Sequence, residues 1–467
     1  MNSYFQFDQL EGILLRGAKD NKFSNSTGSV LSVLPFDTKK LPKVFSENTG
    51  ELLGELMRNN TNMKISKIEE DSFVSNKIVD NILKSIDFNN EEESEEFFEG
   101  FLEDYLNMEG SKESPLHPHL FMYNDLSEKE RKEKIKYAIF INEVLLGGQD
   151  KFKDLFLDKS SDNLLTQLIM ESLPELIGNS NQKKNKYAVI NVGLVEQFQK
   201  DFIYLSNKKE YFLKHLFTLI HYYLFQYFLQ FFKSAQSFGT VSDRKVTPLN
   251  HVLDWETGVG SYREAVKEYN TIREHADKLF VHVHCMSHLS HNQVNLENER
   301  HVFSYYKVKK DLESLDDEML KREKENLISW IKKYCELAKV EESNGLSDKE
   351  IPELFETLFS SIKIKMNDDV KKKYGNNLSN IGASIALKSR GRHGNVLSLS
   401  QDLLLMLCAV SVGDEKIHLK DLFNNLEQRG VKFDHYSRVE VINLLDHLNY
   451  IEKKSDSGDA QYVKPIL

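Results

Sequence analysis

The chain is 467 residues long and carries a formal net charge of −11 at neutral pH. This length exceeds what one ordinary hydrophobic core organises, so two or three domains are expected. The acidic balance excludes a protein that is coated in nucleic acid through a generally basic surface, but not one that binds through a local basic patch. Only 8 prolines and 22 glycines punctuate the chain. Such sparse punctuation predicts a mainly α fold with long helices.

Cysteine usage and the N-terminus bear on the compartment. Cys285, Cys335 and Cys408 are scattered, so no disulfide framework is predicted and a reducing cytoplasm is expected. The first residues lack the basic and apolar regions of a secretory signal peptide. The one membrane-like run, Leu216–Phe232, is shorter than the roughly 20 apolar residues that span a bilayer, and it contains His221. We expect a buried helix there and no membrane partner.

The N-terminal part, residues 1–112, is predicted to be a helical region with short strands. Its acidic segment, residues 91–104, keeps phenylalanines at helical spacing. A docked helix with a solvent-facing acidic side is the favoured interpretation, and a surface that binds a basic partner is the alternative. Pro115 and Pro118 cannot continue a helix, so the first domain boundary is placed after residue 112.

The central domain, residues 113–387, is predicted to be helical. A helix begins at Ser127 and ends at Gly147. The segment Tyr211–Phe232 contains ten aromatic residues, and rings on every side of a helix predict burial on every side. A nucleic-acid stacking platform is the alternative, but such platforms interleave cations. Further helices are predicted over Tyr262–His275, Leu312–Val340 and Ser379–Leu387.

The C-terminal domain, residues 388–467, is predicted to be a winged helix that follows a flexible basic joint, Lys388–Asn395. The expected elements are an apolar helix capped by Ser400, a short strand at Ile417–Leu419, helices over Lys420–Arg429 and His435–Leu448, and strands over Tyr450–Ser455 and Ala460–Ile466. Helix, strand, helix, helix and hairpin is the winged-helix order. Gly458 supplies the positive φ that a tight hairpin needs.

The third helix of this domain is predicted to bury one apolar stripe, Val439, Ile442, Leu445 and Leu448. It is expected to expose His435, Ser437, Arg438, Glu440, Asn443 and His447. One arginine and one glutamate are a thin set for reading bases, so contact with double-stranded DNA is expected through phosphates. The candidate DNA-binding residues are Lys388, Arg390, Arg392, His435, Arg438, Asn443, Lys453, Lys454 and Lys464. These residues favour DNA contact and protein–protein docking equally.

Two other clusters carry ligand-type side chains. In the run His282–His291, His284 and His288 have the i, i+4 spacing that lets two imidazoles share a metal, and Cys285 and His291 are further candidate ligands. The glutamate of the HExxH motif is missing, so imidazoles scattered on a polar helix face are the favoured interpretation.

Asp254 and Glu256 can serve as an acid–base pair or hold Mg²⁺, but a charged turn before a helix starting near Ser261 is favoured. No P-loop, dinucleotide-binding glycine motif, nucleophile elbow or kinase motif set occurs. The sequence therefore predicts no catalytic residue and no cofactor. The alternative is a metal-dependent nuclease that uses the histidine cluster or the Asp254/Glu256 pair.

Three C-terminal strings together resemble the DptG (DndG) family: residues 391–397, 428–434 and 455–463. The string Leu253–Glu256 resembles it more loosely. The resemblance implies a component of the restriction module of bacterial DNA phosphorothioation systems, an anti-phage defence that attacks DNA lacking the sulfur modification. It implies two partner proteins, at least one of them an ATPase, and assigns no catalytic residue. We expect a non-enzymatic, DNA-contacting and scaffolding subunit, with a pure protein–protein assembly adaptor as the other alternative.

Overall fold

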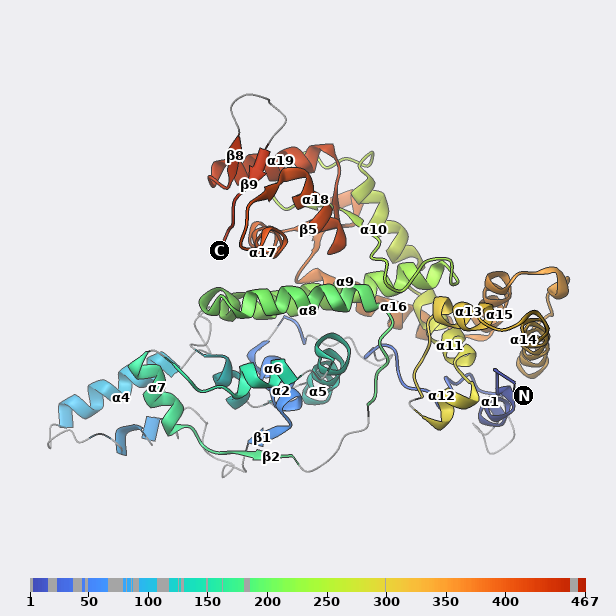
Figure 1. Ribbon diagram of the computed structural model, residues 1–467, viewed down its shortest axis with the longest axis horizontal. Helices are drawn as coiled ribbons and strands as arrows, with labels where there is room; N and C mark the ends of the chain where they lie inside the picture. The colour runs from blue at the N-terminus through green and yellow to red at the C-terminus, as the bar shows by residue number, and fades with distance from the viewer. Residues whose placement is uncertain are drawn as a thin grey trace. The chain divides into compact units, whose positions relative to one another are not determined.

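The computed structural model is mainly helical, as the sequence predicts (Figure 1). It describes residues 3–15, 23–36, 44–46, 49–65, 79–80, 82–84, 86, 92–106, 117–124, 126, 130–147, 150–161, 163–179, 185–298, 300–453 and 461–467. The chain divides into two compact units, each discontinuous in sequence. The large unit holds residues 1–41, 185–201 and 221–467, and the small unit holds residues 42–184 and 202–220.

The small unit is built from short helices around α2. Its elements are α2 (Thr49–Thr61), β1 (Met63–Ile65), α4 (Glu92–Leu106), the 3-10 turn η1 (Pro118–Tyr123), α5 (Arg131–Phe140), the π-helical turn η2 (Ile141–Leu146), α6 (Asp150–Leu157), α7 (Leu164–Ser172) and β2 (Leu176–Gly178). Buried Arg58 on α2 donates to the carbonyls of Met122 and Asn124, each at 2.7 Å, which fixes η1 against α2.

Two predictions fall in the small unit. The helix predicted from Ser127 to Gly147 ends as expected, because Gly147 adopts φ 65° and closes η2. Its described start is Arg131, and Ser127 lies outside the described residues. The acidic helix α4 buries Leu102 but leaves 81% of the Phe97 side chain exposed. Both interpretations of this helix therefore stay open.

The large unit contains most of the helices and all strands of the two larger sheets. Its elements before the C-terminal region are α1 (Phe7–Leu15), α8 (Val192–Ser206), α9 (Lys209–Gln236), β3 (Leu249–Leu253), α10 (Glu264–His275), α11 (Lys278–Leu289), α12 (Gln293–Glu297), α13 (Tyr305–Glu313), α14 (Asp317–Ala338), η3 (Leu346–Asp348), α15 (Ile351–Lys365) and α16 (Asp368–Ala383). Residues of α8 and α9 are divided between the two units.

The aromatic helix α9 is buried on every side from residue 219 to residue 232, as predicted for this part, whereas Lys214 in its first turns is exposed. Two of its buried polar side chains have partners inside the protein, as burial requires. His221 Nε2 lies 2.8 Å from the carbonyl of Ile381, and the Gln230 amide exchanges two 2.8 Å hydrogen bonds with the backbone of Thr247. In the described part of the chain, no helix has the length and apolar character needed to cross a membrane.

A four-stranded sheet of order β4-β5-β3-β7 joins distant parts of the large unit. β4 (Leu387–Ser389), β5 (Asn395–Leu399) and β7 (Val431–Phe433) come from the C-terminal residues. β3 pairs in parallel with both β5 and β7. The sheet therefore crosses the boundary predicted between residues 387 and 388. α10 packs on β3 and β5 through a cluster of small apolar side chains, Val252, Ala265, Val266 and Val396 (Figure 1).

The helix predicted over Ser379–Leu387 is confirmed only as far as Ala383, and the prediction of a flexible joint after it is wrong. α16 ends at Ala383, and the joint is a β-hairpin in which β4 pairs antiparallel with β5 around the short turn η4 (Gly391–His393). Val396, Leu397 and Leu399 are buried in the sheet. The local sequence is polar and glycine-rich, and the strand that orders it, β3, lies far earlier in the chain.

The C-terminal elements follow in the predicted order, except that an unpredicted strand, β7, lies between α18 and α19. They are α17 (Gln401–Val412), β6 (Ile417–His418), α18 (Leu419–Gln428), α19 (His435–His447), β8 (Ile451–Lys453) and β9 (Gln461–Val463). β6, β9 and β8 form a three-stranded antiparallel sheet in that order. Ser400 caps α17 as predicted, accepting the N–H of Leu403 at 3.2 Å. The turn between β8 and β9, with Gly458, lies outside the described residues.

A buried ion pair fastens the end of α18 to α8. Arg429 donates to the two carboxylate oxygens of Asp201 at 2.6 and 2.7 Å, and both side chains are at most 6% exposed. The hydroxyl of Tyr223 donates to the same carboxylate at 2.5 Å. A bidentate, hydrogen-bonded geometry of this kind offsets the cost of burying both charges.

Candidate nucleic-acid interface

A buried polar network joins the end of β3, the start of α10 and the start of α19. Arg263 donates to Glu256 at 2.9 Å, to the Ser437 hydroxyl at 2.8 Å and to both carboxylate oxygens of Asp434. Asp434 also caps α19 by accepting the N–H of Ser437 at 3.0 Å. Burial opposes the positive charge of Arg263, but its bonds to Asp434 and Glu256 keep its pKa above the ordinary value. We call Glu256, Arg263, Asp434 and Ser437 the buried network.

The carboxylates of Glu256 and Asp254 both accept hydrogen bonds from groups within the protein. Glu256 is 6% exposed and accepts the backbone N–H of Leu253 at 2.7 Å and the Ser437 hydroxyl at 2.6 Å, besides Arg263. Asp254 accepts the Ser398 hydroxyl at 2.6 Å. The carboxylates of the predicted charged turn therefore hold neighbouring elements together by hydrogen bonds. The two carboxylates serve different partners and do not converge on one position.

The β4–β5 hairpin is anchored on the same end of β3 by two of the predicted DNA-binding residues. Arg390 donates to the carbonyls of Leu253 at 2.8 Å and Glu256 at 2.9 Å. Lys388 donates to the carbonyl of Asp254 at 2.9 Å. These carbonyls end a buried strand and need donors. Both cations therefore have structural partners, and Arg390 in particular holds the hairpin to the sheet.

The turn η4 and helix α10 form the walls of a groove, which we call the α10–η4 groove. Gly391 and Gly394 bound the turn with φ of 59° and 72°, a conformation that favours glycine. A side chain at Gly394 would also meet Arg273 Nη1 at 3.2 Å, so glycine lets α10 approach the turn. The carbonyl of His393 accepts the Asn270 amide at 3.0 Å, which fixes the turn on the helix.

The α10–η4 groove encloses about 550 Å³. Its lining residues are Ser261, Val266, Lys267, Asn270, Thr271, Arg273, Glu274, Gly391, Arg392, His393 and Gly394. Arg273 and Arg392 are exposed, and neither has an ion-pair partner among the described residues. Lys267 pairs with Glu264 at 3.1 Å on an exposed surface, a bond worth little in water. Guanidinium, ammonium, amide and hydroxyl donors in one concave surface suit phosphate oxygens.

The third C-terminal helix, α19, exposes a different set of side chains from the predicted one. Its buried positions are Ser437, Val441 and Leu445. Of the predicted apolar stripe Leu445 is buried, but Val439 is 41% exposed, and the predicted exposure of Ser437 is wrong. A polar residue occupies the core because the buried network satisfies it. Arg438 donates to the carbonyl of Phe433 at 3.2 Å and lies over the Phe423 ring.

The remaining described candidates lie on α19, on β8 and just after β9, and both lysines among them have polar partners. His435 and Asn443 are exposed on α19. Lys453 pairs with Asp446 at 3.0 Å, and Lys464 lies 3.5 Å from the side-chain oxygen of Asn449. Lys454 lies outside the described residues. The structure therefore brings together only Arg392 from the predicted set with other cations in a hollow.

The histidine-rich helix α11 is buried and its imidazoles contact protein groups. His288 Nε2 lies 3.0 Å from the carbonyl of Ser26, and His291 accepts the N–H of Ser29 at 3.1 Å. His282 stacks on Phe359 with ring centroids 4.2 Å apart. Burial lowers the pKa of His282 and His288 to about 3 and that of His284 to about 4, so these rings are neutral. Cys285 is buried, and burial raises the pKa of its thiol to about 12.

No group of three His, Cys, Asp or Glu side chains is placed to hold a metal ion within the part of the chain that the structure describes. α11 and the residues just after it instead form a wall on which the N-terminal segment packs, since Ser26 bonds to His288 and Ser29 to His291. The expectation of a polar helix face is wrong, because these imidazoles are buried in the core.

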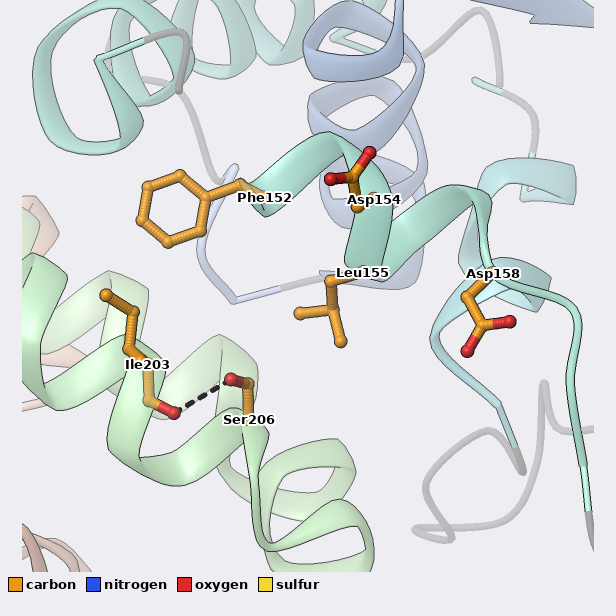
Figure 2. A pocket seen from close by; sticks show the side chains of 6 residues that line it. All are labelled: Phe152, Asp154, Leu155, Asp158, Ile203 and Ser206. Atoms are coloured by element: carbon orange, nitrogen blue, oxygen red, sulfur yellow. Dashed lines mark hydrogen bonds between the residues drawn. The ribbon is translucent and has the colours of Figure 1, made fainter. Parts of the chain in front are cut away.

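A second hollow of about 430 Å³ lies in the small unit, between α6 and the end of α8. In Figure 2 the carboxylate of Asp154 points away from Ile203 and Ser206. The Ser206 hydroxyl donates to the carbonyl of Ile203 at 2.8 Å, and Asp158 accepts two bonds from Ser160. Its polar groups are largely engaged inside the chain, so the α10–η4 groove is the better candidate site.

Sequence reasoning singled out Arg392 but missed Lys267, Arg273 and His393. The first two lie on a helix that was predicted, but polar residues at helical spacing usually face solvent without further role. Lys267 and Arg273 become part of a candidate site only because η4 lies against α10. Comparisons with models of known protein families and with curated protein sequences find no match. The resemblance to the DptG family therefore stays an expectation.

Proposed function

We propose that this protein is a non-enzymatic subunit that contacts DNA through the α10–η4 groove and scaffolds a phosphorothioation-dependent restriction complex. The observation that carries the DNA contact is the pair Arg273 and Arg392, which line one concave surface and have no ion-pair partner in the described chain. A local patch of this kind attracts phosphates even though the whole chain is acidic.

The C-terminal elements support the same proposal. α17, β6, α18, α19, β8 and β9 follow in winged-helix order, and we propose that they form such a domain. Its third helix offers few cations, so DNA contact would use phosphates more than base edges. β7, inserted between α18 and α19, pairs with β3 and so fastens this domain to the sheet that also carries η4.

The choice of partners rests on the resemblance to the DptG family. It supports an assembly in which partner proteins, at least one of them an ATPase, supply ATP hydrolysis. This chain has no P-loop sequence, which fits that division of labour. The proposed role of this subunit is to hold DNA and partners together.

Salt-titrated binding to a mixed-sequence duplex tests the DNA contact. Wild type is expected to lose affinity steeply as salt rises, because each phosphate contact releases a counterion. The triple variant Lys267→Ala/Arg273→Ala/Arg392→Ala is expected to flatten the slope of log K against log salt by roughly 2 to 3. The matched control is Lys321→Ala/Arg322→Ala/Lys372→Ala, which removes the same charge from exposed positions on α14 and α16.

Equal slopes for wild type and both variants would contradict the DNA contact and favour the assembly adaptor. The nuclease alternative has a separate test, because elemental analysis and a cleavage assay with added divalent cations detect it directly. The structure favours neither of its proposed centres: the imidazoles of α11 are buried against protein groups, and Glu256 is saturated by its neighbours.

A further inference from the structure

Three aromatic rings of the large unit are exposed on its surface. Tyr262 is 63% exposed, Tyr436 is 57% exposed and Trp255 is 36% exposed. Among the described residues of the large unit, these are the exposed large aromatic side chains. A single exposed ring needs no explanation, but Tyr262 and Tyr436 lie together on the surface. Their placement therefore needs a reason.

The buried network fixes where these rings lie. Trp255, Tyr262 and Tyr436 each immediately precede a network residue, Glu256, Arg263 or Ser437. Arg263, at the start of α10, bonds to Asp434 and Ser437 at the start of α19, so Tyr262 and Tyr436 lie close together. Their ring centroids lie 6.4 Å apart at an angle of 71°. Arg263 also lies 5.1 Å from the centre of the Tyr436 ring, which holds that ring in place.

We infer that Tyr262 and Tyr436 form a stacking platform for an unpaired base, so that the groove takes single-stranded nucleic acid. Ser261, the residue before Tyr262, lines the α10–η4 groove, so the rings border the surface that carries Arg273 and Arg392. Aromatic faces next to a cationic groove are the combination that binds single strands: phosphates follow the cations and bases stack on the rings. The inference rests on the proposed nucleic-acid contact and adds the class of strand.

The charge of the surroundings favours a nucleic acid over a protein partner. Tyr262 adjoins the groove, whose lining carries three cations, Lys267, Arg273 and Arg392, against one carboxylate, Glu274. Arg263 offsets one of the two carboxylate charges of Glu256 and Asp434. A rigid ring loses little conformational entropy when a base stacks on it, since its orientation is already fixed.

Binding of a short fluorescein-labelled oligothymidine and of a mixed-sequence duplex of equal length, measured by anisotropy on the full chain, tests the inference. Tyr262→Ala/Tyr436→Ala is expected to weaken oligothymidine binding by roughly 5- to 100-fold and to change duplex binding by less than about twofold. Tyr262→Phe/Tyr436→Phe keeps both rings and is expected to bind like wild type. Both double variants should melt like wild type, because the side chains are more than half exposed.

The outcomes separate this inference from the proposed function. If the alanine variant binds oligothymidine like wild type while Lys267→Ala/Arg273→Ala/Arg392→Ala weakens it, the groove contacts phosphates and the stacking platform is overturned. If the phenylalanine and alanine variants lose binding equally, the rings do not act by stacking and the inference is again overturned. If light scattering shows that only the alanine variant changes its oligomeric mass, with unchanged binding, the rings bury against a second copy.

Discussion

The interior at the end of β3 and the α10–η4 groove use the same residue types in opposite ways. Arg390 and Arg392 lie on one hairpin, two positions apart. Arg390 donates to backbone carbonyls at the end of the sheet, while Arg392 lines an open hollow. The comparison teaches that a cation is available for a ligand only where the fold leaves it without a partner. Polar groups in the interior are expected to control stability, and those in the groove to control binding.

The largest expected effect concerns pH and the interior. Burial lowers the pKa of His282 and His288 to about 3 and that of His284 to about 4, while the unfolded chain takes up protons below about pH 6.5. Stability is therefore intact above that pH and is lost progressively toward pH 3. Between pH 7 and pH 5 the three rings together should cost about 5 kcal/mol, measured by urea unfolding.

Two replacements sharpen this test. His288→Asn should destabilise the protein at pH 7 but reduce the loss between pH 7 and pH 5 by about 2 kcal/mol. His447→Asn, at an exposed position on α19, is the matched control and should leave the loss as in wild type. An equal pH dependence in wild type and His288→Asn would show that the buried cluster does not set it.

The next effect separates a buried ion pair from an exposed one. Asp201→Asn leaves Arg429 buried without its counter-charge and should lower the free energy of unfolding by about 3 to 5 kcal/mol. Glu196→Gln removes the partner of Arg244 at a pair whose side chains are 47% and 70% exposed, and it should cost less than about 1 kcal/mol. Similar losses of unfolding free energy in the two variants would contradict the claim that the buried ion pair stabilises the protein more than the exposed one.

The two hairpin arginines provide the closest comparison. Arg390→Ala should destabilise the protein by about 1 to 3 kcal/mol, because it removes the guanidinium donor from the carbonyl of Glu256 and one of the two donors from that of Leu253. Arg392→Ala should change stability by less than about 0.5 kcal/mol, because its side chain is exposed. Thermal and urea unfolding of both variants measure this. A larger loss from Arg392→Ala would contradict the assignment of roles.

The smallest effect compares the groove with the wing. Arg392→Ala should weaken duplex binding by about fivefold to tenfold, whereas Lys453→Ala should weaken it by less than about threefold, because Lys453 is paired with Asp446. Fluorescence anisotropy at constant salt measures both. A greater loss from Lys453→Ala would place the main phosphate contact on the wing.

Much of the fold follows from local sequence. The aromatic content of α9 predicts its burial. Capping residues and glycines predict the order of the C-terminal elements, as Ser400 does at the start of α17. The hairpin at residues 387–399 was missed because its ordering strand, β3, is distant in sequence. The burial of Ser437 was missed because periodicity treats serine as exposed, whereas Arg263 and Glu256 supply its partners.

The candidate site was predictable only in part for the same reason. Arg392 is conspicuous in a short basic string, but Arg390 looks the same there, and only three-dimensional contacts tell them apart. Arg273 lines the groove only because Gly394, which has no side chain, lets the turn η4 lie against α10.

Photo-crosslinking to DNA tests the central claim most directly. The full chain is irradiated with a duplex and with a single strand that both carry thiothymidine, and the adducts are located by peptide mass spectrometry. The account predicts adducts in the peptides that contain residues 261–274 and 391–394, which line the α10–η4 groove. Adducts confined to other parts of the chain, such as α14 or the small unit, would contradict it.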